Sequence, residues 1–132
     1  MAMMMIKNAG GVGSKISVRG HEVMVDVPPA MDGQDRGPTP VDLLAGALGG
    51  CIAFYIARWC REANLPYEGL EIDMDYILDI EAHCVPGLSA VVRMPAGFPQ
   101  ERTQALLKVA TSCTVHNTLC SLPKIEITVG GK

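Results

Sequence analysis

The stretch that decides the fold covers residues 37–63 and reads GPTPVDLLAGALGGCIAFYIARWCREA. Thr39 can serve as the N-cap of a helix, because its hydroxyl can accept a hydrogen bond from a free backbone N–H. Pro40 fits the first helical position, and Asp42 places a carboxylate near the positive end of the helix. These three start signals agree, so the sequence predicts a long helix that begins at Pro40.

This helix is expected to continue to Ala63, before Asn64 and Pro66 end it. At a rise of 1.5 Å per residue its length is about 33 Å. The sequence is apolar on nearly every side of the helix, which is typical of a helix buried on most sides. A chain of 132 residues has little protein with which to surround it. We therefore predict a homodimer, in which a second copy covers part of the helix.

Residues before the helix have a two-residue period. Apolar side chains alternate with polar ones on both sides of residues 19–21, which predicts a hairpin with one buried face; they are Ile16, Val18, Val23, Val25 and Val27. Pro28 and Pro29 should end this hairpin. The stretch 30–37 has no apolar period, and we expect an exposed loop of the kind that carries function or mobility.

Residues after the helix predict two more strands. Alternating apolar residues suggest strands over 70–80 and 88–94, joined by a turn at residues 85–87, Val-Pro-Gly. A further helix should open at Pro99 and end near Thr111.

A short helix is expected to follow. It should begin around Cys113, with Thr111 or Ser112 as its N-cap, and the alternating residues 125–129 should form a final strand. This order of elements predicts the α+β class, in a single domain over residues 1–132.

The charge of the chain argues against two kinds of partner. The formal net charge is -3, and Lys and Arg are scattered singly along the sequence. Nucleic acids and anionic membranes both require a dense positive field, so we expect neither as a partner. The uncharged run 43–57 is shorter than the roughly 20 residues that a bilayer requires, which favours a buried soluble helix. The N-terminal residues lack the apolar stretch of a secretory signal, so we expect a cytoplasmic protein.

Cys51 and Cys113 stand out among the five cysteines. Cys51 shares a helix face with apolar side chains and follows two glycines, which allow another backbone or a ligand to approach closely. Cys113 is expected at a helix N-terminus, where free N–H groups favour the reactive thiolate. Each of these cysteines could instead be an inert thiol of the core.

The other cysteines have plainer interpretations. Cys60 lies nine positions after Cys51, about 180° around the helix, so we expect it to be structural. Cys84 should be an exposed turn residue. Cys113, His116 and Cys120 have i, i+3 and i+7 spacing and could supply three zinc ligands, but no fourth ligand is evident. We favour a packing or supporting role for His116 and expect neither a metal nor a cofactor.

The sequence resembles the OsmC/Ohr family over nearly its whole length. The sharpest part is the segment from Pro40 to Cys51, which has the pattern P-x-[DE]-L-L-x-x-x-L-G-x-C, and TSCTVHNTL surrounds Cys113 in the place of the family's second cysteine. The resemblance implies an intertwined α+β homodimer, in which two long central helices pack together and antiparallel sheets from both chains wrap around them.

The resemblance also implies a chemistry. In peroxidases of the family the first cysteine attacks an organic hydroperoxide, the second closes a disulfide, and a dithiol reductant reopens it. Cys51 and Cys113 match these two positions. Such a reaction requires an apolar pocket for an alkyl peroxide, and we expect Leu44, Leu48 and Tyr55 to line it.

Three positions depart from the pattern of the family. Family peroxidases use an arginine after two glycines to stabilise the thiolate, but Val12 stands there in this chain. Arg19 or Arg36 could replace that arginine, and we favour Arg36. The acidic partner of that arginine comes one residue late, as Asp42, so Asp42 is either that partner or only a helix cap. Thr114 stands where a proline usually follows the second cysteine.

These residues favour a thiol-dependent peroxidase that reduces organic hydroperoxides in defence against oxidative stress. The alternative is a non-catalytic dimer of the same fold, which binds a small apolar or acyl ligand between its subunits. The missing arginine at Val12 favours that alternative.

Overall fold

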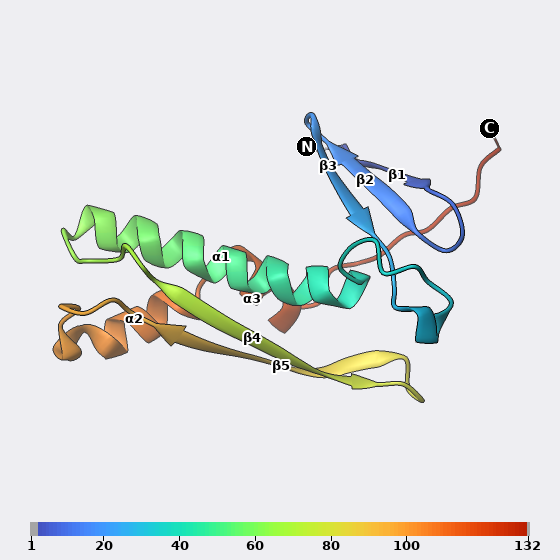
Figure 1. Ribbon diagram of the computed structural model, residues 1–132. Helices are drawn as coiled ribbons and strands as arrows, with labels where there is room; N and C mark the ends of the chain where they lie inside the picture. Colours follow the sequence, from blue (N-terminus) through green and yellow to red (C-terminus); the bar gives the residue numbers. More distant parts are fainter. Residues whose placement is uncertain (1–2, 132) are drawn as a thin grey trace. The chain divides into compact units, whose positions relative to one another are not determined.

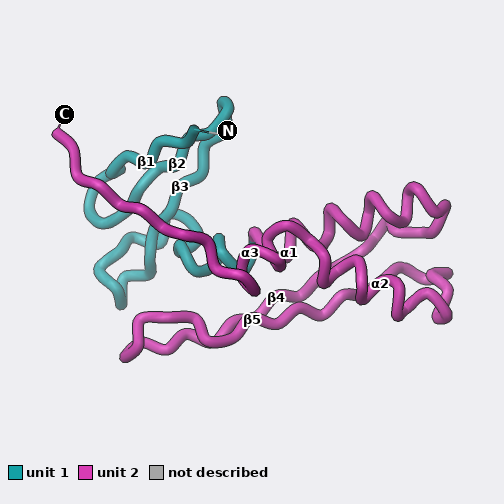
Figure 2. Tube along the Cα trace, turned by 180° about the vertical axis from the view of Figure 1, so that it is seen from behind, with its two compact units in different colours: residues 1–46 teal, residues 47–132 magenta. Residues whose placement is uncertain are grey.

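A computed structural model describes residues 3–131 of the chain (Figure 1). Strands and helices occur in separate runs along the chain, so the predicted α+β class is confirmed. Two compact units can be distinguished, residues 1–46 and residues 47–132 (Figure 2). The single domain over residues 1–132 stays a prediction.

The first unit contains a three-stranded antiparallel sheet in the order β1-β2-β3. Its strands are β1 (Met5–Asn8), β2 (Ser14–Val18) and β3 (His21–Val25). β2 and β3 form the predicted hairpin, and their turn uses left-handed backbone at Arg19 and Gly20. The sequence did not predict β1, because every residue of this edge strand is exposed and none provides a buried alternation.

The loop after β3 folds back closely on that strand. It contains a short 3-10 helix, η1 (Pro29–Met31), and returns to the sheet where Asp26 N–H donates to Pro38 O over 3.2 Å. A Cβ atom at Gly37 would lie 2.2 Å from Met24 O, so only glycine fits this approach. The loop predicted over residues 30–37 is confirmed as mostly exposed, but its backbone is tied to β3 at both ends.

Helix α1 (Pro40–Glu62) begins where the sequence predicts. Thr39 N–H donates to Asp42 Oδ2 over 2.9 Å, and Asp42 N–H donates to Thr39 Oγ1 over 3.0 Å. This reciprocal pair is a capping box, which satisfies two N–H groups at the helix start. The helix ends at the expected place as well, since Asn64 adopts a left-handed φ of 54° and Leu65 N–H donates to Cys60 O.

The core of the second unit lies along one face of α1. Its fully or nearly buried residues recur at every fourth position and pack against the helix α2 (Thr103–Ala110) and against Cys113; they are Leu48, Ile52, Ile56 and Cys60. Apolar residues of β4 (Glu71–Asp79) and β5 (Cys84–Arg93) cover the same cluster. Figure 1 shows α1 lying along the β4–β5 pair.

The turn between β4 and β5 is not where the sequence predicts. Val85, Pro86 and Gly87 lie inside β5, and the chain reverses over residues 80–83. Ala82 N–H donates to Asp79 Oδ1 over 3.0 Å, and His83 has a left-handed φ of 52°. Pro86 is tolerated because a register irregularity between Ile77 and Asp79 falls opposite it, so its missing N–H removes no regular ladder bond.

The last helices need one correction. Helix α2 follows a 3-10 turn, η2 (Gln100–Arg102), and ends before Thr111 as predicted. The N-cap of α3 (Thr114–Cys120) is Cys113 itself, whereas Thr111 and Ser112 had been expected to cap it. The hydroxyls of Thr111 and Ser112 donate to carbonyls of α2 instead, so they cannot serve the next helix.

The predicted final strand is not formed within residues 3–131. Residues 122–131 have no strand pairing, and Ile125, Ile127 and Val129 are largely exposed. The alternation of the sequence is that of a strand, but no neighbouring strand of the described chain accepts its hydrogen bonds. The pattern therefore predicts a pairing that the single chain does not supply.

One side of α1 is also uncovered in the single chain. Phe54 is 56% exposed and Leu44 is 38% exposed, while Ala47 and Gly50 are exposed between them. The helix is long and apolar enough to cross a membrane, but the core helix of a soluble protein meets the same criteria. The prediction that α1 is buried on most sides is therefore not met within one chain.

Candidate functional site

The structure brings Cys51 and Cys113 together. Cys51 lies on α1 and is half-buried, while Cys113 is completely buried at the start of α3. The Cys51 thiol is close enough to affect the pKa of Cys113, and Cys51 packs against the core cluster that contains Cys113. Two oxidisable thiols from distant segments thus lie close together, which is the arrangement that a reversible disulfide requires.

The surroundings of Cys113 act on its thiol in opposite directions. Burial raises the pKa of Cys113, whereas the His116 N–H, which donates to its Sγ over 3.3 Å, lowers the pKa. The nearby Cys51 thiol raises this pKa again. The predicted helix N-terminus at Cys113 is confirmed, but burial has the larger effect, so the thiol form of Cys113 is favoured over its thiolate.

A second contact joins the same two segments. Tyr55, one helical turn after Cys51, forms a 2.7 Å hydrogen bond with Thr114 Oγ1. The Tyr55 ring is held from the side of the helix, because the Arg58 guanidinium lies 4.8 Å from its centroid and the Phe54 ring meets it edge-on. Sequence reasoning missed the Tyr55–Thr114 bond, since nothing local links residues 59 positions apart.

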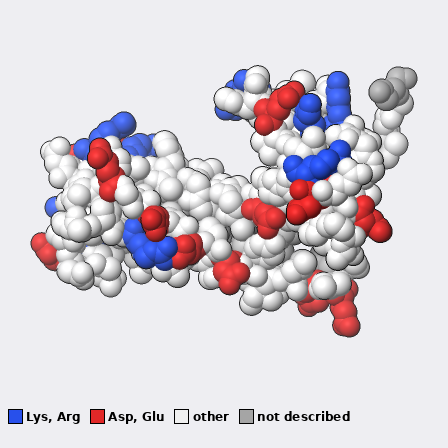
Figure 3. Space-filling view, in the orientation of Figure 1, with Lys and Arg blue, Asp and Glu red and all other residues white. Residues whose placement is uncertain are grey.

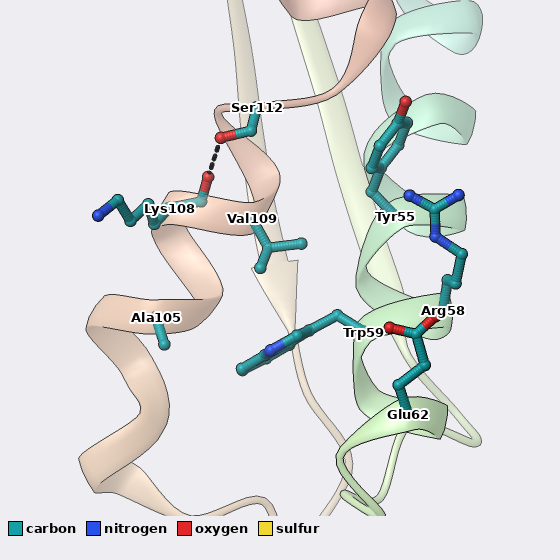
Figure 4. Close-up of a pocket in the computed structure, with 8 residues that line it drawn as sticks. All are labelled: Tyr55, Arg58, Trp59, Glu62, Ala105, Lys108, Val109 and Ser112. Carbon is teal, nitrogen blue, oxygen red and sulfur yellow. Dashed lines mark hydrogen bonds between the residues drawn. The ribbon is translucent and has the colours of Figure 1, made fainter.

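A cavity of about 520 Å³ opens between α1 and α2 next to this contact (Figure 4). Trp59 points from α1 toward α2, and Val109 and Ala105 face it, so the walls between the helices are mainly apolar. Ser112, which precedes Cys113, closes one end and donates to Lys108 O over 2.6 Å. Tyr55, Arg58 and Glu62 contribute the remaining polar edge from α1.

Only one of the three predicted pocket residues lines this cavity. Tyr55 does, whereas Leu48 is buried in the core cluster and Leu44 belongs to the exposed side of α1. Trp59 and Val109 were missed as lining residues. Their signal is helical spacing, because Trp59 follows Tyr55 by four residues and Val109 follows Ala105 by four.

Arg36 forms an ion pair within the first unit. Its Nε donates to Asp26 Oδ2 over 2.7 Å, and its two Nη groups donate to the carbonyls of Ala9 and Gly10. The Asp26 carboxylate also accepts N–H bonds from Val27 and from Arg36 itself. This network joins the turn before β2, the end of β3 and the loop before α1. The predicted catalytic role of Arg36 stays a prediction.

Asp26 should give the protein a characteristic response to acid. The Arg36 side chain and backbone N–H bonds lower the pKa of Asp26 from its ordinary value of 3.8 to about 2. Since the folded state holds the ionised form more tightly, its contribution to stability is present above about pH 4 and is lost as the pH falls toward 2. We expect urea titrations to show that Asp26→Asn has a lower free energy of unfolding than the parent protein at pH 7. The difference between the two proteins should become smaller as the pH falls to 2.5.

Asp32→Asn is the matched control for this measurement. Asp32 is exposed in the same unit, and its left-handed backbone suits asparagine equally well. A constant difference between Asp26→Asn and the parent protein at every pH would contradict the assignment.

The other predicted catalytic residue, Asp42, occupies the capping box described above. A helix cap was one of its two expected roles, and that role is confirmed. Its pairing with an arginine stays a prediction. Val12, at the position of the missing arginine, is exposed in the turn before β2.

The remaining cysteines differ in exposure. Cys60 is completely buried, and burial raises the pKa of its thiol, as expected for a structural residue. Cys84 and Cys120 are exposed, although Cys84 starts β5 and is not part of a turn. Cys120 Sγ lies 3.7 Å from His116 Nε2, and within residues 3–131 no three potential ligands gather around a metal position.

Charged side chains of both signs are mixed on the surface. In the view of Figure 3, Lys and Arg atoms lie beside Asp and Glu atoms. One such group consists of Arg93, Asp73 and Glu71 on β4 and β5, where the Arg93 guanidinium bonds both carboxylates. The contact with Arg93 lowers the pKa of Asp73. The absence of a nucleic-acid partner stays a prediction.

Comparison with known proteins identifies similar folds. A structure from Psychrobacter arcticus, named for an osmotic stress and detoxification response, has a TM-score of 0.83 at 17% identity and covers 89% of this chain and 88% of its own. An OsmC-like protein of Mycoplasma pneumoniae has a TM-score of 0.78 at 12% identity, with 92% and 89% covered. The organic hydroperoxide resistance protein OhrB of Bacillus subtilis has a TM-score of 0.64 at 19% identity, with 92% of each chain covered.

The sequence itself gives the family. No curated protein matches the chain. The model of the family described as OsmC-like protein matches residues 33–128, which is well over half of the 132 residues and includes both Cys51 and Cys113. The fold, the paired thiols and this match agree, and the chain belongs to the OsmC-like protein family.

Proposed function

We propose that this protein is a thiol-dependent peroxidase that reduces organic hydroperoxides with Cys51 and Cys113. The contact between a half-buried thiol and a completely buried one carries the proposal. The name of the similar Bacillus subtilis structure, an organic hydroperoxide resistance protein, supports it.

The difference in exposure assigns the two roles. A peroxide must reach the first sulfur, and Cys51 is the more accessible of the pair. Cys113 has no exposed surface, so its sulfur is directed to a partner within the protein and is kept from bulk oxidants. Cys51 is therefore the peroxide-reducing thiol, and Cys113 is the resolving thiol.

The reaction proceeds in balanced steps. The Cys51 thiolate attacks the terminal oxygen of the hydroperoxide, the O–O bond breaks, and the alkoxide takes up a proton to leave as an alcohol. Cys51 is then a sulfenic acid. The Cys113 sulfur attacks the Cys51 sulfur, the S–O bond breaks, and water leaves as the disulfide forms. A dithiol reductant returns both residues to thiols.

The raised pKa of Cys113 has a consequence in this scheme. At neutral pH the Cys113 proton stays on its sulfur until the resolving step, in which it leaves with the hydroxide of the sulfenic acid as water. Once that proton is gone, the N–H of His116 stabilises the new thiolate, which is the form that attacks the sulfenic acid.

The cavity beside Tyr55 is the proposed place for the organic group of the substrate. Its walls of Trp59, Val109 and Ala105 favour an alkyl or aryl group over water-like hydrogen peroxide. Stopped-flow oxidation should therefore be at least about tenfold faster with cumene hydroperoxide than with hydrogen peroxide, because each buried methylene contributes about 0.8 kcal/mol. Equal rate constants for the two peroxides would contradict an organic substrate.

We also propose that the functional unit is a homodimer. The exposed side of α1 and the unpaired residues 122–131 both leave large apolar side chains uncovered in the single chain. A second copy of the chain would cover the exposed side of α1 and provide a strand that pairs with residues 122–131. This agrees with the intertwined dimer that the family resemblance implies.

Sizing experiments test the dimer. At micromolar concentration the particle mass should be twice the 14.1 kDa of one chain. Phe54→Asp should shift the particle to one chain mass, because a carboxylate would be placed on the exposed apolar side of α1. Glu62→Gln, at the end of the same helix, is the control and should remain dimeric. A parent protein that elutes as a single chain would contradict the proposal.

One observation favours a second candidate function. The Arg36 side chain donates hydrogen bonds to Asp26, Ala9 and Gly10. These bonds are typical of an arginine that stabilises the fold, whereas a catalytic arginine would donate to the thiolate. The alternative is a non-catalytic dimer that binds a small apolar or acyl ligand in the cavity beside Tyr55. Calorimetry with decanoate, together with slow and unselective thiol oxidation by peroxide, would support this alternative.

A further inference from the structure

The Tyr55–Thr114 hydrogen bond joins the same two segments as the pair of thiols. Tyr55 follows Cys51 by four residues, so both side chains lie on one face of α1. Thr114 follows Cys113 directly and is the first residue of α3. The bond of 2.7 Å therefore spans the gap between α1 and α3 right beside the contact of the two sulfurs.

Both ends of this bond make further contacts. The Tyr55 ring contacts the Arg58 guanidinium, 4.8 Å from its centroid, and the Phe54 ring, at 5.3 Å between ring centroids. On the other side, Thr114 O accepts a bond from the Thr118 hydroxyl over 2.8 Å, which stiffens the first turn of α3. A hydrogen bond between two rigid segments constrains their separation more than one between mobile side chains does.

The segment around Cys113 needs such a constraint. The Cys113 Sγ is itself the cap of α3, and it must move toward Cys51 to form a disulfide of about 2.05 Å, which disturbs its bond from the His116 N–H. Losing the cap weakens the start of a helix of only seven residues. A hydroxyl pair that does not take part in the chemistry can hold the start of α3 in place while the sulfur moves.

We propose that Tyr55 and Thr114 are positioning residues, whose hydrogen bond holds Cys113 against Cys51 and favours closure of the Cys51–Cys113 disulfide. This proposal rests on the proposed function for its biological purpose, because closing the disulfide is the resolving step of the peroxidase cycle. Its physical content is independent of peroxide, since the bond raises the effective concentration of one thiol at the other.

The test is a redox equilibrium with glutathione, which needs no peroxidase activity. The protein carries Cys84→Ser and Cys120→Ser, because both of these thiols are exposed and would react with glutathione. Mixtures of reduced and oxidised glutathione set the potential, and peptide mapping gives the fraction of Cys51–Cys113 disulfide. Tyr55→Phe and Thr114→Val each remove one hydroxyl and keep the shape of the side chain.

Each single variant should lower the equilibrium constant for disulfide formation about tenfold, a shift of about 30 mV toward a less stable disulfide. The double variant should be no weaker than either single variant, because both changes remove the same bond. Thr114→Ser keeps the hydroxyl, so its equilibrium constant for disulfide formation should equal that of the parent protein. Thr103→Val removes a hydroxyl bond of similar length to Gln100 O, at the start of α2, and should stay within about twofold of the parent.

The outcomes separate this proposal from the proposed function. Equal potentials for the parent protein and the two single variants would overturn it, as would multiplicative losses in the double variant or a parent protein that forms no Cys51–Cys113 disulfide. A parent protein that forms the disulfide with glutathione and shows the predicted shifts, but does not consume hydroperoxide, would refute the peroxidase and leave the positioning role intact.

Discussion

Cys51→Ser is expected to lower the rate of organic hydroperoxide consumption by roughly a thousandfold or more, because a serine hydroxyl is a far weaker nucleophile than a thiolate. Cys51 is the reachable sulfur of the contact pair, and Cys113 is completely buried and so cannot take its place. The loss should appear in the first turnover as well as in the steady state. The measurement is the disappearance of cumene hydroperoxide in single-turnover and multiple-turnover assays.

Cys113→Ser should behave differently. The first equivalent of hydroperoxide is still consumed, since Cys51 remains, but no disulfide can close and Cys51 stays a sulfenic acid that dimedone traps. Cys84→Ser is the control, because Cys84 is exposed on β5 and lies outside the thiol pair. Hydroperoxide consumption that survives Cys51→Ser, or a normal disulfide in Cys113→Ser, would contradict the assigned roles.

Ile56→Ala is expected to destabilise the protein by about 2–5 kcal/mol, the usual cost of truncating a fully buried aliphatic side chain. Ile56 has no exposed surface and lies in the core cluster, between Ile52 and Cys60 on α1. Alanine would leave a cavity that rigid neighbours from α2 and the sheet can fill only in part. The free energy of unfolding is measured by urea titration at several protein concentrations.

Phe54→Ala is the matched comparison, two residues away on the same helix. Phe54 is 56% exposed, so within one chain its truncation removes much less buried surface than that of Ile56. In a dimer that covers this side of α1, the loss should grow with protein concentration, because association then contributes to stability. A destabilisation by Phe54→Ala as large as that of Ile56→Ala in dilute protein would contradict the placement of the core.

Local signals made α1 predictable from the sequence. Thr39, Pro40 and Asp42 each act within one turn, and the capping box at the helix start contains two of them. The hairpin of β2 and β3 was predictable for a similar reason, because its alternation and its turn lie within a short stretch.

Contacts between distant segments could not be read from a pattern. Cys51 and Cys113 were matched through the family resemblance, and only the fold brings them into contact. The Asp26–Arg36 pair shows what remains hidden, because a charged residue that follows a hairpin gives no sign that it will be buried by a loop residue. Tyr55 was predicted as a pocket residue, but its bond to Thr114 depends on where α3 packs.

Two of the structural predictions from the sequence were wrong, each for a physical reason. Val85, Pro86 and Gly87 have the composition of a turn, but they lie in a two-stranded sheet at a register irregularity, where proline is tolerated. The final strand over residues 125–129 has a correct two-residue period without a partner strand among residues 3–131. A period predicts which side chains share a face, but it does not supply the neighbour that completes a ladder.

The most direct test of the peroxidase is to treat the fully reduced protein with one equivalent of cumene hydroperoxide and to map every cysteine by mass spectrometry within the first seconds. The proposed function predicts one Cys51–Cys113 disulfide per equivalent, with Cys60, Cys84 and Cys120 still reduced. Slow oxidation, spread over the exposed Cys84 and Cys120 with no Cys51–Cys113 disulfide, would contradict it and favour the ligand-binding dimer.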